Sequence, residues 1–289
     1  GDVSDDSLQE QTYSRSISQV TATWWNDTFW EDWDNDGVPE TLCHTTVGVF
    51  WFDSDGIPGP ERIILVRTKH CSHDRDGDGH DDLFFMRFRG LDMVDQNSDG
   101  IPERHDVLTR VVWTWDNGTY EDVNIDLFVH ARTDADQDGN LERRVVLNRQ
   151  QRMVDQGIGA VLTAYFSHSR LILRVDSNDD GTPERWMAID HTSWVWDPTE
   201  DGNADRHRDY LRAVIRKDTN QDGSVDVVRA LHQNTVQFDN DSNGVIELQW
   251  TWRAGVLKVD TDHDGDLDYT AWMHGWHQHW DWGMVEYHI

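Results

Sequence analysis

The sequence predicts an all-β repeat protein, and three observations lead to this prediction. An acidic nine-residue phrase, D-x-D/N-x-D/N-G-x-x-D/E, recurs along the chain at close to 21-residue spacing, and this spacing is unbroken from Asp176 to Asp260. The segments between the phrases alternate aromatic and polar residues and contain glycine, which is typical of β-hairpins. No segment shows a sustained helical period. A fixed period of this kind indicates a repeat architecture.

The acidic phrase predicts calcium-binding loops. Calcium takes about six to eight oxygen ligands, and side chains at positions 1, 3 and 5 of a tight loop converge on one point. Glycine at position 6 permits the sharp turn, position 7 offers its backbone carbonyl, and the acid at position 9 closes the site. Turn formation alone would explain Asp, Asn and Gly in these loops. It would not explain three or four crowded acids, which repel one another without a cation.

We expect about nine calcium sites of this type, with side-chain ligands at positions 1, 3, 5 and 9 of each loop. The predicted ligands are Asp32, Asp34, Asp36, Glu40, Asp74, Asp76, Asp78, Asp82, Asp95, Asn97, Asp99, Glu103, Asp134, Asp136, Asp138, Glu142, Asp176, Asn178, Asp180, Glu184, Asp197, Thr199, Asp201, Asp205, Asp218, Asn220, Asp222, Asp226, Asp239, Asp241, Asn243, Glu247, Asp260, Asp262, Asp264 and Asp268. Four degenerate loops, near residues 53, 116, 155 and 281, keep the turn and lose most ligands, so we expect them to bind metal weakly or not at all.

Each 21-residue unit is interpreted as one calcium loop followed by a hairpin of two short strands. Two of the expected hairpin turns are Arg253-Ala-Gly255 and His274-Gly275. Successive units differ, because a Glu-Arg pair follows alternate loops at Glu61-Arg62, Glu103-Arg104, Glu142-Arg143 and Glu184-Arg185, and the units between them lack it. The true period is then 42 residues, or four strands.

Seven such units over residues 1–289 predict a single domain that forms a seven-bladed β-propeller. The N-terminal strands, expected at 13–19 and 20–25, would share the last blade with the C-terminus. All calcium loops would then emerge on one face of the disc. The alternative is an open β-hairpin solenoid or a spiral like that of YD-repeat shells.

The loops resemble those of the FG-GAP/integrin-type propeller family, whose blades carry D-x-D-x-D-G-x-x-D between strands. The resemblance covers the loops from Asp32 to Asp268; the FG and GAP signatures themselves are absent, and the blades would be shorter. It implies extracellular calcium and a role in adhesion or ligand binding.

The composition narrows the class of protein. The formal net charge is −30, which would destabilise a compact metal-free state, so folding and calcium loading should be coupled. The acidity argues against nucleic acid and anionic membranes as partners, because polyanions are bound by basic patches. No stretch is long enough to span a membrane. Many low-affinity calcium sites need millimolar calcium, which predicts a secreted or cell-surface protein. The sequence leaves open whether Cys43 and Cys71 form a disulfide.

Two other groups of residues are candidates for function. Tryptophans occur in i, i+2 pairs, as at Trp194/Trp196 and Trp250/Trp252, and spacing of two places both rings on one sheet face. We expect them to pack between blades; a glycan-stacking surface is the alternative. His274, His277 and His279 form one histidine group, and His70, Cys71 and His73 another; a transition-metal site is the alternative interpretation of both.

No catalytic motif such as G-x-S-x-G or H-E-x-x-H occurs. We therefore expect a secreted, calcium-stabilised binding or adhesion module that recognises a glycan or a surface polymer and has no catalytic activity. The first alternative is a structural subunit of an extracellular calcium-dependent filament or sheet, with self-association. The second is a polysaccharide-active enzyme with its site in the central channel.

Overall fold

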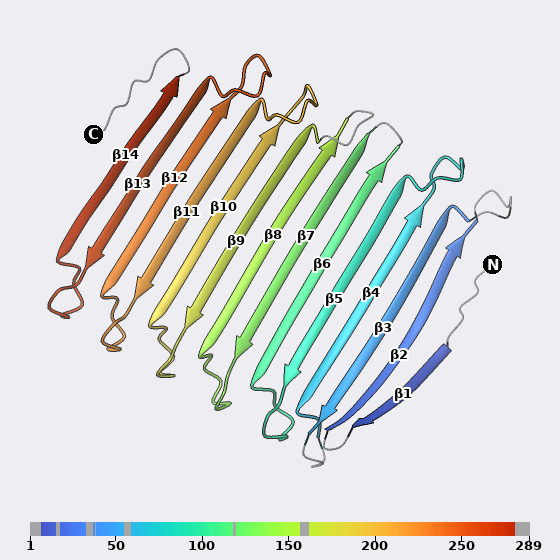
Figure 1. The fold of residues 1–289 in the computed structure, drawn as a ribbon. Helices are drawn as coiled ribbons and strands as arrows, with labels where there is room; N and C mark the ends of the chain where they lie inside the picture. The colour runs from blue at the N-terminus through green and yellow to red at the C-terminus, as the bar shows by residue number, and fades with distance from the viewer. Residues whose placement is uncertain are drawn as a thin grey trace. The chain divides into compact units, whose positions relative to one another are not determined.

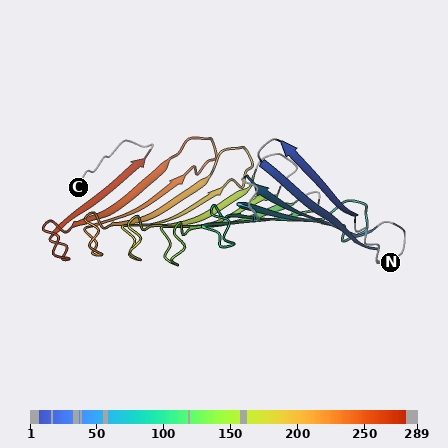
Figure 2. The same ribbon diagram turned by 90° about the horizontal axis from the view of Figure 1, so that it is seen from below.

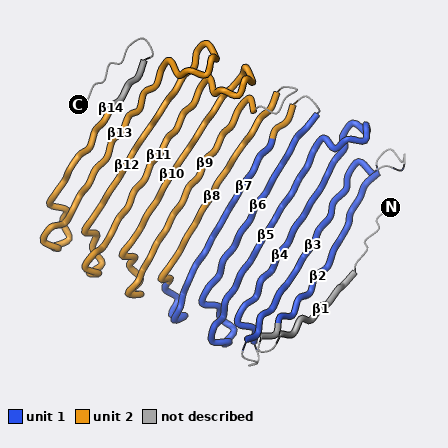
Figure 3. Tube along the Cα trace, in the orientation of Figure 1, with its two compact units in different colours: residues 1–118, 123–140 blue, residues 119–122, 141–289 orange. Residues whose placement is uncertain are grey.

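The computed structural model describes residues 7–15, 18–32, 37, 39–54, 59–117, 120–156 and 162–280. For residues 7–15, 18–19 and 276–280 it describes the backbone only. The chain divides into two compact units: unit 1 holds Gly1–Gly118 and Val123–Asn140, and unit 2 holds Thr119–Asp122 and Leu141–Ile289 (Figure 3). Among the described residues, no helix is long and apolar enough to cross a membrane.

Every element of the described chain is a β-strand (Figure 1). Unit 1 contains β1 (Ser7–Arg15), β2 (Ser18–Glu31), β3 (Thr41–Asp53), β4 (Arg62–His73), β5 (Leu83–Val94), β6 (Arg104–Asp116) and most of β7 (Glu121–Thr133). Unit 2 contains β8 (Arg143–Asp155), β9 (Ala164–Val175), β10 (Arg185–Trp196), β11 (Arg206–Lys217), β12 (Val227–Phe238), β13 (Leu248–Val259) and β14 (Tyr269–Trp280). The all-β prediction is confirmed.

The strands of each unit form an open antiparallel sheet in chain order. In unit 2 the seven strands β8 to β14 are paired without interruption, each with the strands before and after it. A propeller would break this pairing after every fourth strand to begin a new blade. The predicted seven-bladed propeller is therefore wrong. Of the alternative that we gave, the general feature is confirmed: the strands form an open all-β repeat instead of a closed ring.

The repeat unit is one long strand and one loop, not a loop and a hairpin. The predicted hairpin turns at Gly255 and Gly275 lie in the middle of β13 and β14, and neither glycine has the positive φ that a two-residue hairpin turn requires. Mid-strand glycines instead make room for neighbouring side chains. A Cβ on Gly90 would lie 3.3 Å from the ring of Phe88, and one on Gly255 would lie 2.9 Å from Met273 Cε. Here glycine marks close packing within a strand.

The strand register places even-numbered and odd-numbered residues on opposite faces of each sheet. Partners in β2–β6, and likewise in β8–β14, always join two even or two odd residue numbers, as in Arg185↔Lys217 and Trp194↔Arg208. Directly opposed side chains share a face. Even-numbered residues of these strands therefore form one face, called the even face, and odd-numbered residues form the odd face.

Neither unit has a second layer. Among the described residues, each strand contacts only its neighbours in the chain, and the view in Figure 2 shows the strands of each unit as one sheet. Few apolar side chains are buried: Ala22, Cys43, Val47, Val112 and Val154. The tryptophan pairs consequently do not pack between blades. Trp194 and Trp196 lie together on the even face of unit 2, with ring centroids 6.4 Å apart.

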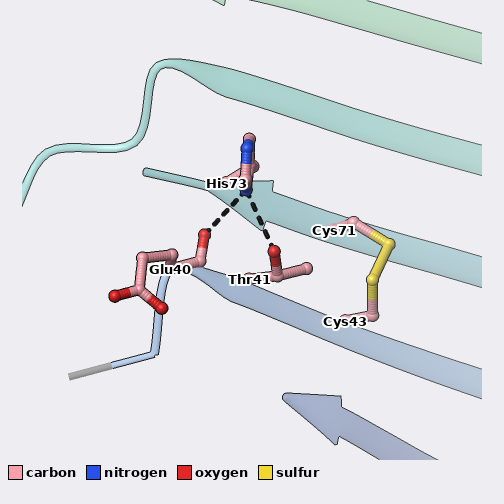
Figure 4. Close-up of a disulfide and its surroundings, with 5 residues drawn as sticks. All are labelled: Glu40, Thr41, Cys43, Cys71 and His73. Carbon is pink, nitrogen blue, oxygen red and sulfur yellow. Dashed lines mark hydrogen bonds between the residues drawn. A yellow bond between two sulfur atoms is a disulfide. The ribbon is translucent and has the colours of Figure 1, made fainter. Parts of the chain in front are cut away.

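Cys43 and Cys71 form a disulfide, which decides the question that the sequence left open (Figure 4). The two residues are directly opposed on β3 and β4, with 4.1 Å between their Cα atoms. Nearby, His73 Nδ1 lies 3.0 Å from the carbonyl oxygen of Glu40 and 2.9 Å from Thr41 Oγ1 (Figure 4). Because Cys71 is bonded to Cys43, it is not available to the transition-metal site considered for His70, Cys71 and His73.

We expect the double variant Cys43→Ser/Cys71→Ser to lower the free energy of unfolding by about 3 kcal/mol. The disulfide closes a loop between residues separated by 28 positions, and its loss frees the unfolded chain. Urea denaturation in millimolar calcium measures the effect, with dithiothreitol-treated wild type as the control. Equal stability of the oxidised and reduced wild type would contradict the prediction.

Candidate functional site

The acidic phrases coincide with the loops that join the long strands. Consecutive strands are antiparallel, so successive loops lie at opposite ends of the strands, as Figure 1 shows within each unit. Our prediction that all loops emerge on one face is therefore wrong. The 42-residue period has a simple cause: it is the spacing of loops at the same end of the sheet. The four Glu-Arg pairs, which precede β4, β6, β8 and β10, all occur in loops of the same set.

The loops share one backbone conformation. Glycine at position 6 has a positive φ in nine loops: Gly37, Gly79, Gly100, Gly139, Gly181, Gly202, Gly223, Gly244 and Gly265. Position 4 also has a positive φ, although it is seldom glycine: Gly77, Ser98, Gln137, Asp179, Glu200, Gln221, Ser242 and His263. The role predicted for glycine at position 6 is confirmed. The second left-handed position was not foreseen.

The aspartate at position 1 organises each loop. In the loop after β11, one carboxylate oxygen of Asp218 accepts a hydrogen bond from the N–H of Gln221 at 2.7 Å, and the other accepts one from Gly223 at 2.8 Å. Asp74 and Asp260 make the same two bonds in their loops. In these three loops the left-handed positions 4 and 6 direct both N–H groups at one carboxylate.

The residue at position 9 closes the loop from the other side. Its carboxylate accepts a hydrogen bond from the N–H of position 2, as in Gln96 to Glu103 at 2.8 Å and Thr261 to Asp268 at 3.0 Å. Two of the degenerate loops keep this contact. Ser54 N–H donates to Glu61, and Gln156 N–H donates to Thr163 Oγ1, where a hydroxyl replaces the carboxylate. In these two loops the contact between positions 2 and 9 is kept; residues 55–58 and 157–161 lie outside the described part of the chain.

The loop carboxylates are the most deeply buried side chains of the described chain. Asp226 is 1% exposed and Asp239 and Asp260 are each 2% exposed, less than any buried apolar residue. Burial alone would raise the pKa of Asp226, but hydrogen bonds from Thr219 and His263 hold it well below its usual range. A buried carboxylate costs free energy unless it is hydrogen-bonded and paired with a cation.

Three of the loops bring predicted ligands together within one unit. Their carboxylate oxygens lie within 4.8 Å of one another in each group. The groups are Asp74, Asp76 and Asp78; Asp176, Asp180 and Glu184; and Asp239, Asp241 and Glu247. These clusters could hold a metal ion.

The cluster at Asp176 has buried oxygens that a cation could satisfy. Asp176 Oδ1 and Glu184 Oε1 are buried and have no hydrogen-bond donor among the described residues. Both residues belong to one group of convergent carboxylates, so a cation bound there would offer these oxygens a partner. All the donors are hard oxygens, the ligand type that calcium and magnesium prefer.

The remaining predicted ligands stay predictions. Asp34 and Asp36 lie outside the described residues, while Asp32 accepts the expected hydrogen bond from Gly37 N–H at 3.0 Å. Asp134, Asp136 and Asp138 belong to unit 1 and Glu142 to unit 2. At the threonine-bearing loop, Thr199 Oγ1 donates to Asp197 at 3.1 Å. Of the degenerate loops, the one near residue 281 lies outside the described residues.

Loops at the same end of the sheet are linked to one another. The N–H of position 1 donates to the carbonyl oxygen of position 9 in the preceding loop at that end, as in Asp218 to Glu184 and Asp260 to Asp226, both at 2.8 Å. The same bond joins Asp74 to Glu40 and Asp239 to Asp205. Each loop therefore helps to position the next one at its own end.

Side chains at position 4 add a second link that our sequence reasoning missed. Gln137 Nε2 donates to the carbonyl oxygen of Ile101 at 2.7 Å. His263 Nδ1 lies 2.9 Å from Asp226, and this hydrogen bond raises the pKa of His263. Ser242 and Glu200 make corresponding contacts with Asp205 and Thr163, respectively. The pattern in the sequence is that position 4 is always polar or glycine, although its identity varies.

For the group His274, His277 and His279, the structure describes only the side chain of His274. The ring of His274 stacks on Trp272, with centroids 6.3 Å apart and planes 5° apart. The side chains of His277 and His279 lie outside the described residues.

Substituting the position-6 glycine tests the loop conformation. Gly223 has φ +87°, and a Cβ there would meet nothing within 4 Å, so Gly223→Ala is strained by its backbone alone. We expect a loss of about 1–2 kcal/mol in the free energy of unfolding. Gly275→Ala is the control, since it also has open space but an ordinary strand conformation. Equal effects of the two substitutions in urea denaturation would contradict this account.

Comparison with models of protein families, with curated proteins and with solved structures finds no match to the chain.

Proposed function

We propose that the chain is a secreted, calcium-stabilised binding or adhesion module that recognises a glycan or another surface polymer and is not catalytic. The observation that carries this proposal is that the chain buries charged side chains and exposes large apolar ones. Its deepest side chains are loop carboxylates, while both faces of each sheet are free of a covering layer among the described residues. Metal in the loops would stabilise the strands, and the open faces would be available for binding.

Calcium is the cation that suits these loops best. Positions 1, 3, 5 and 9 supply oxygen ligands from one short segment, and a flexible oxygen cage of this kind suits calcium better than the strict octahedron of magnesium. About nine calcium ions would bring the formal charge from −30 to about −12. The resemblance of the loops to FG-GAP/integrin-type loops also supports calcium from an extracellular medium, and with it secretion or display at the cell surface.

Exposed aromatic rings support recognition of a glycan. Trp113 is 44% exposed, Trp252 is 36% exposed and Trp272 is 66% exposed. A globular protein normally buries such rings, and exposed aromatic surface marks an interaction site. Aromatic rings also pack well against the apolar faces of sugars.

Binding of immobilised glycans and surface polymers in millimolar calcium tests the proposal. We expect calcium-dependent binding of at least one glycan, abolished by chelation, and reduced by Trp252→Ala in protein that keeps its circular-dichroism spectrum. Ala271→Ser, a small change on the neighbouring strand β14, serves as the matched control. Failure of the calcium-loaded protein to bind any glycan or surface polymer would contradict the proposal.

The outer strands favour a second candidate, a subunit of a calcium-dependent extracellular filament or sheet. Among the described strands, β1 and β14 each pair with one strand only, so each has one edge without a described partner. β14 also exposes Tyr269, Trp272 and Met273. Unprotected, apolar edges are places where another chain adds by strand pairing. Light scattering across a concentration series would show calcium-dependent growth that Trp272→Lys blocks; a strict monomer in millimolar calcium would exclude this function.

A further inference from the structure

Four basic side chains lie together on the odd face of unit 1, although the chain as a whole is strongly acidic. This cation cluster consists of Arg67 and Lys69 on β4 and Arg87 and Arg89 on β5. Arg67 is directly opposite Arg89, and Lys69 is directly opposite Arg87. Their Cβ atoms therefore lie about 5 Å apart across the strands and about 7 Å apart along them.

The cluster carries no paired counter-charge in the described part of the chain. None of its four members forms an ion pair there, although Asp27 lines the adjoining cavity. On the even face of the same two strands, by contrast, Arg62 is paired with Asp92 at 2.7 Å. Like charges directly opposite one another destabilise a sheet. In a chain of formal charge −30, four opposed and unpaired cations need an external anion to offset this cost.

The cluster opens into a hollow of suitable size. The four cations line a cavity of about 300 Å³. Arg67 and Arg89 also line a second cavity of about 690 Å³, which therefore adjoins the first. The other lining residues of the second cavity are Trp25, Asp27, Thr45, Val47, Leu65 and Leu91. Volumes of this order suit a ligand of several rings.

Aromatic rings lie on both sides of the cluster. Trp25, which is 36% exposed, is in the same cross-strand row as Arg67 and Arg89. On the other side, the ring of Phe85 lies 4.3 Å from that of Trp113, which is exposed. An acidic sugar has two parts that could bind here. Its carboxylate or sulfate groups would bind arginine, and the apolar face of its ring would stack on tryptophan.

We propose that the cation cluster and the cavity beside Trp25 form a binding site for an acidic polysaccharide, held through its carboxylate or sulfate groups. The inference rests on the proposed function and names the site and the ligand class. A polynucleotide fits less well. Asp27 lines the same cavity, where it would accept hydrogen bonds from hydroxyl groups, which a polysaccharide offers in larger number than a polynucleotide does.

The test is isothermal titration calorimetry of the calcium-loaded chain with a heparin-derived hexasaccharide. Parallel titrations use neutral maltohexaose, inorganic sulfate and a short oligothymidylate. We expect the heparin hexasaccharide to bind most tightly, with an affinity that falls as salt is added. Arg67→Gln/Arg89→Gln should weaken it at least about tenfold. Arg110→Gln is the matched control, because Arg110 is an exposed cation on the even face of the same unit. It should change the affinity less than about twofold.

Each remaining outcome overturns the inference. Equal weakening by Arg110→Gln would show binding through overall charge, tighter binding of oligothymidylate would show a nucleic-acid site, and binding of sulfate alone would show a site for small anions. Binding of maltohexaose that is unaffected by Arg67→Gln/Arg89→Gln would refute the site and leave the proposed glycan-binding function intact. No binding of either hexasaccharide, in variants and wild type with native circular dichroism, would contradict this site, while the wider panel of glycans decides the proposed function.

Discussion

Chelation of calcium is expected to unfold the strands that the loops join. Apolar burial in this chain is slight, and the buried carboxylates of the loops repel one another once the cation is removed. The unfolded chain does not carry preformed sites, so the free energy of calcium binding contributes directly to folding. Far-UV circular dichroism during titration with EGTA should show loss of the β-sheet spectrum in one or two cooperative steps.

Magnesium provides the control for this experiment. Its smaller ion demands a near-ideal octahedron and dehydrates reluctantly, so equimolar magnesium should fail to restore the spectrum that calcium restores. A chain that keeps both its β-sheet spectrum and its melting temperature in excess EGTA would refute the dependence on metal.

The largest effect of a single substitution is expected for Asp176→Ala. One oxygen of this buried carboxylate accepts a hydrogen bond from Gly181 N–H at 2.9 Å, and the other has no donor among the described residues; Asp176 converges with Asp180 and Glu184. The substitution removes a proposed ligand and leaves a backbone donor unsatisfied. In millimolar calcium we expect it to lower the free energy of unfolding by about 3 kcal/mol.

Asp266→Ala is the charge-matched control for Asp176→Ala. Asp266 is exposed, stands at position 7, and is expected to offer the cation only its backbone carbonyl. Both variants lose one negative charge, so a general relief of repulsion would affect them alike. Urea denaturation separates the two cases. If Asp176→Ala is no less stable than Asp266→Ala in calcium, the carboxylate of Asp176 does not hold a metal.

The loops were the most predictable part of this chain, because their chemistry is local. Asp at position 1, glycine at position 6 and the acid at position 9 act within nine residues, and the hydrogen bonds of Asp218 and Glu103 follow the order that the phrase implies. Position 4 was missed since its contacts reach another loop. Gln137 and His263 act on residues 36 and 37 positions away, which no spacing within the phrase reveals.

The sheet was harder to predict because a mid-strand glycine and a hairpin glycine look alike in sequence. Gly255 ends the predicted turn Arg253-Ala-Gly255, yet it lies in mid-strand and leaves room for Met273, as Gly90 does for Phe88. The cation cluster shows the same limit. Arg67 and Lys69 alternate visibly along the chain, but only the register shows that they oppose Arg89 and Arg87, and the net charge of −30 conceals them.

The most direct test of the account is a count of bound calcium ions by native mass spectrometry of the chain exchanged into millimolar calcium. The account predicts about nine tightly grouped calcium adducts on a compact charge-state distribution, and their loss with a shift to high charge states after chelation. A compact chain that carries no calcium, or only one or two ions with unchanged charge states, would contradict the claim that calcium in the loops holds this open sheet together.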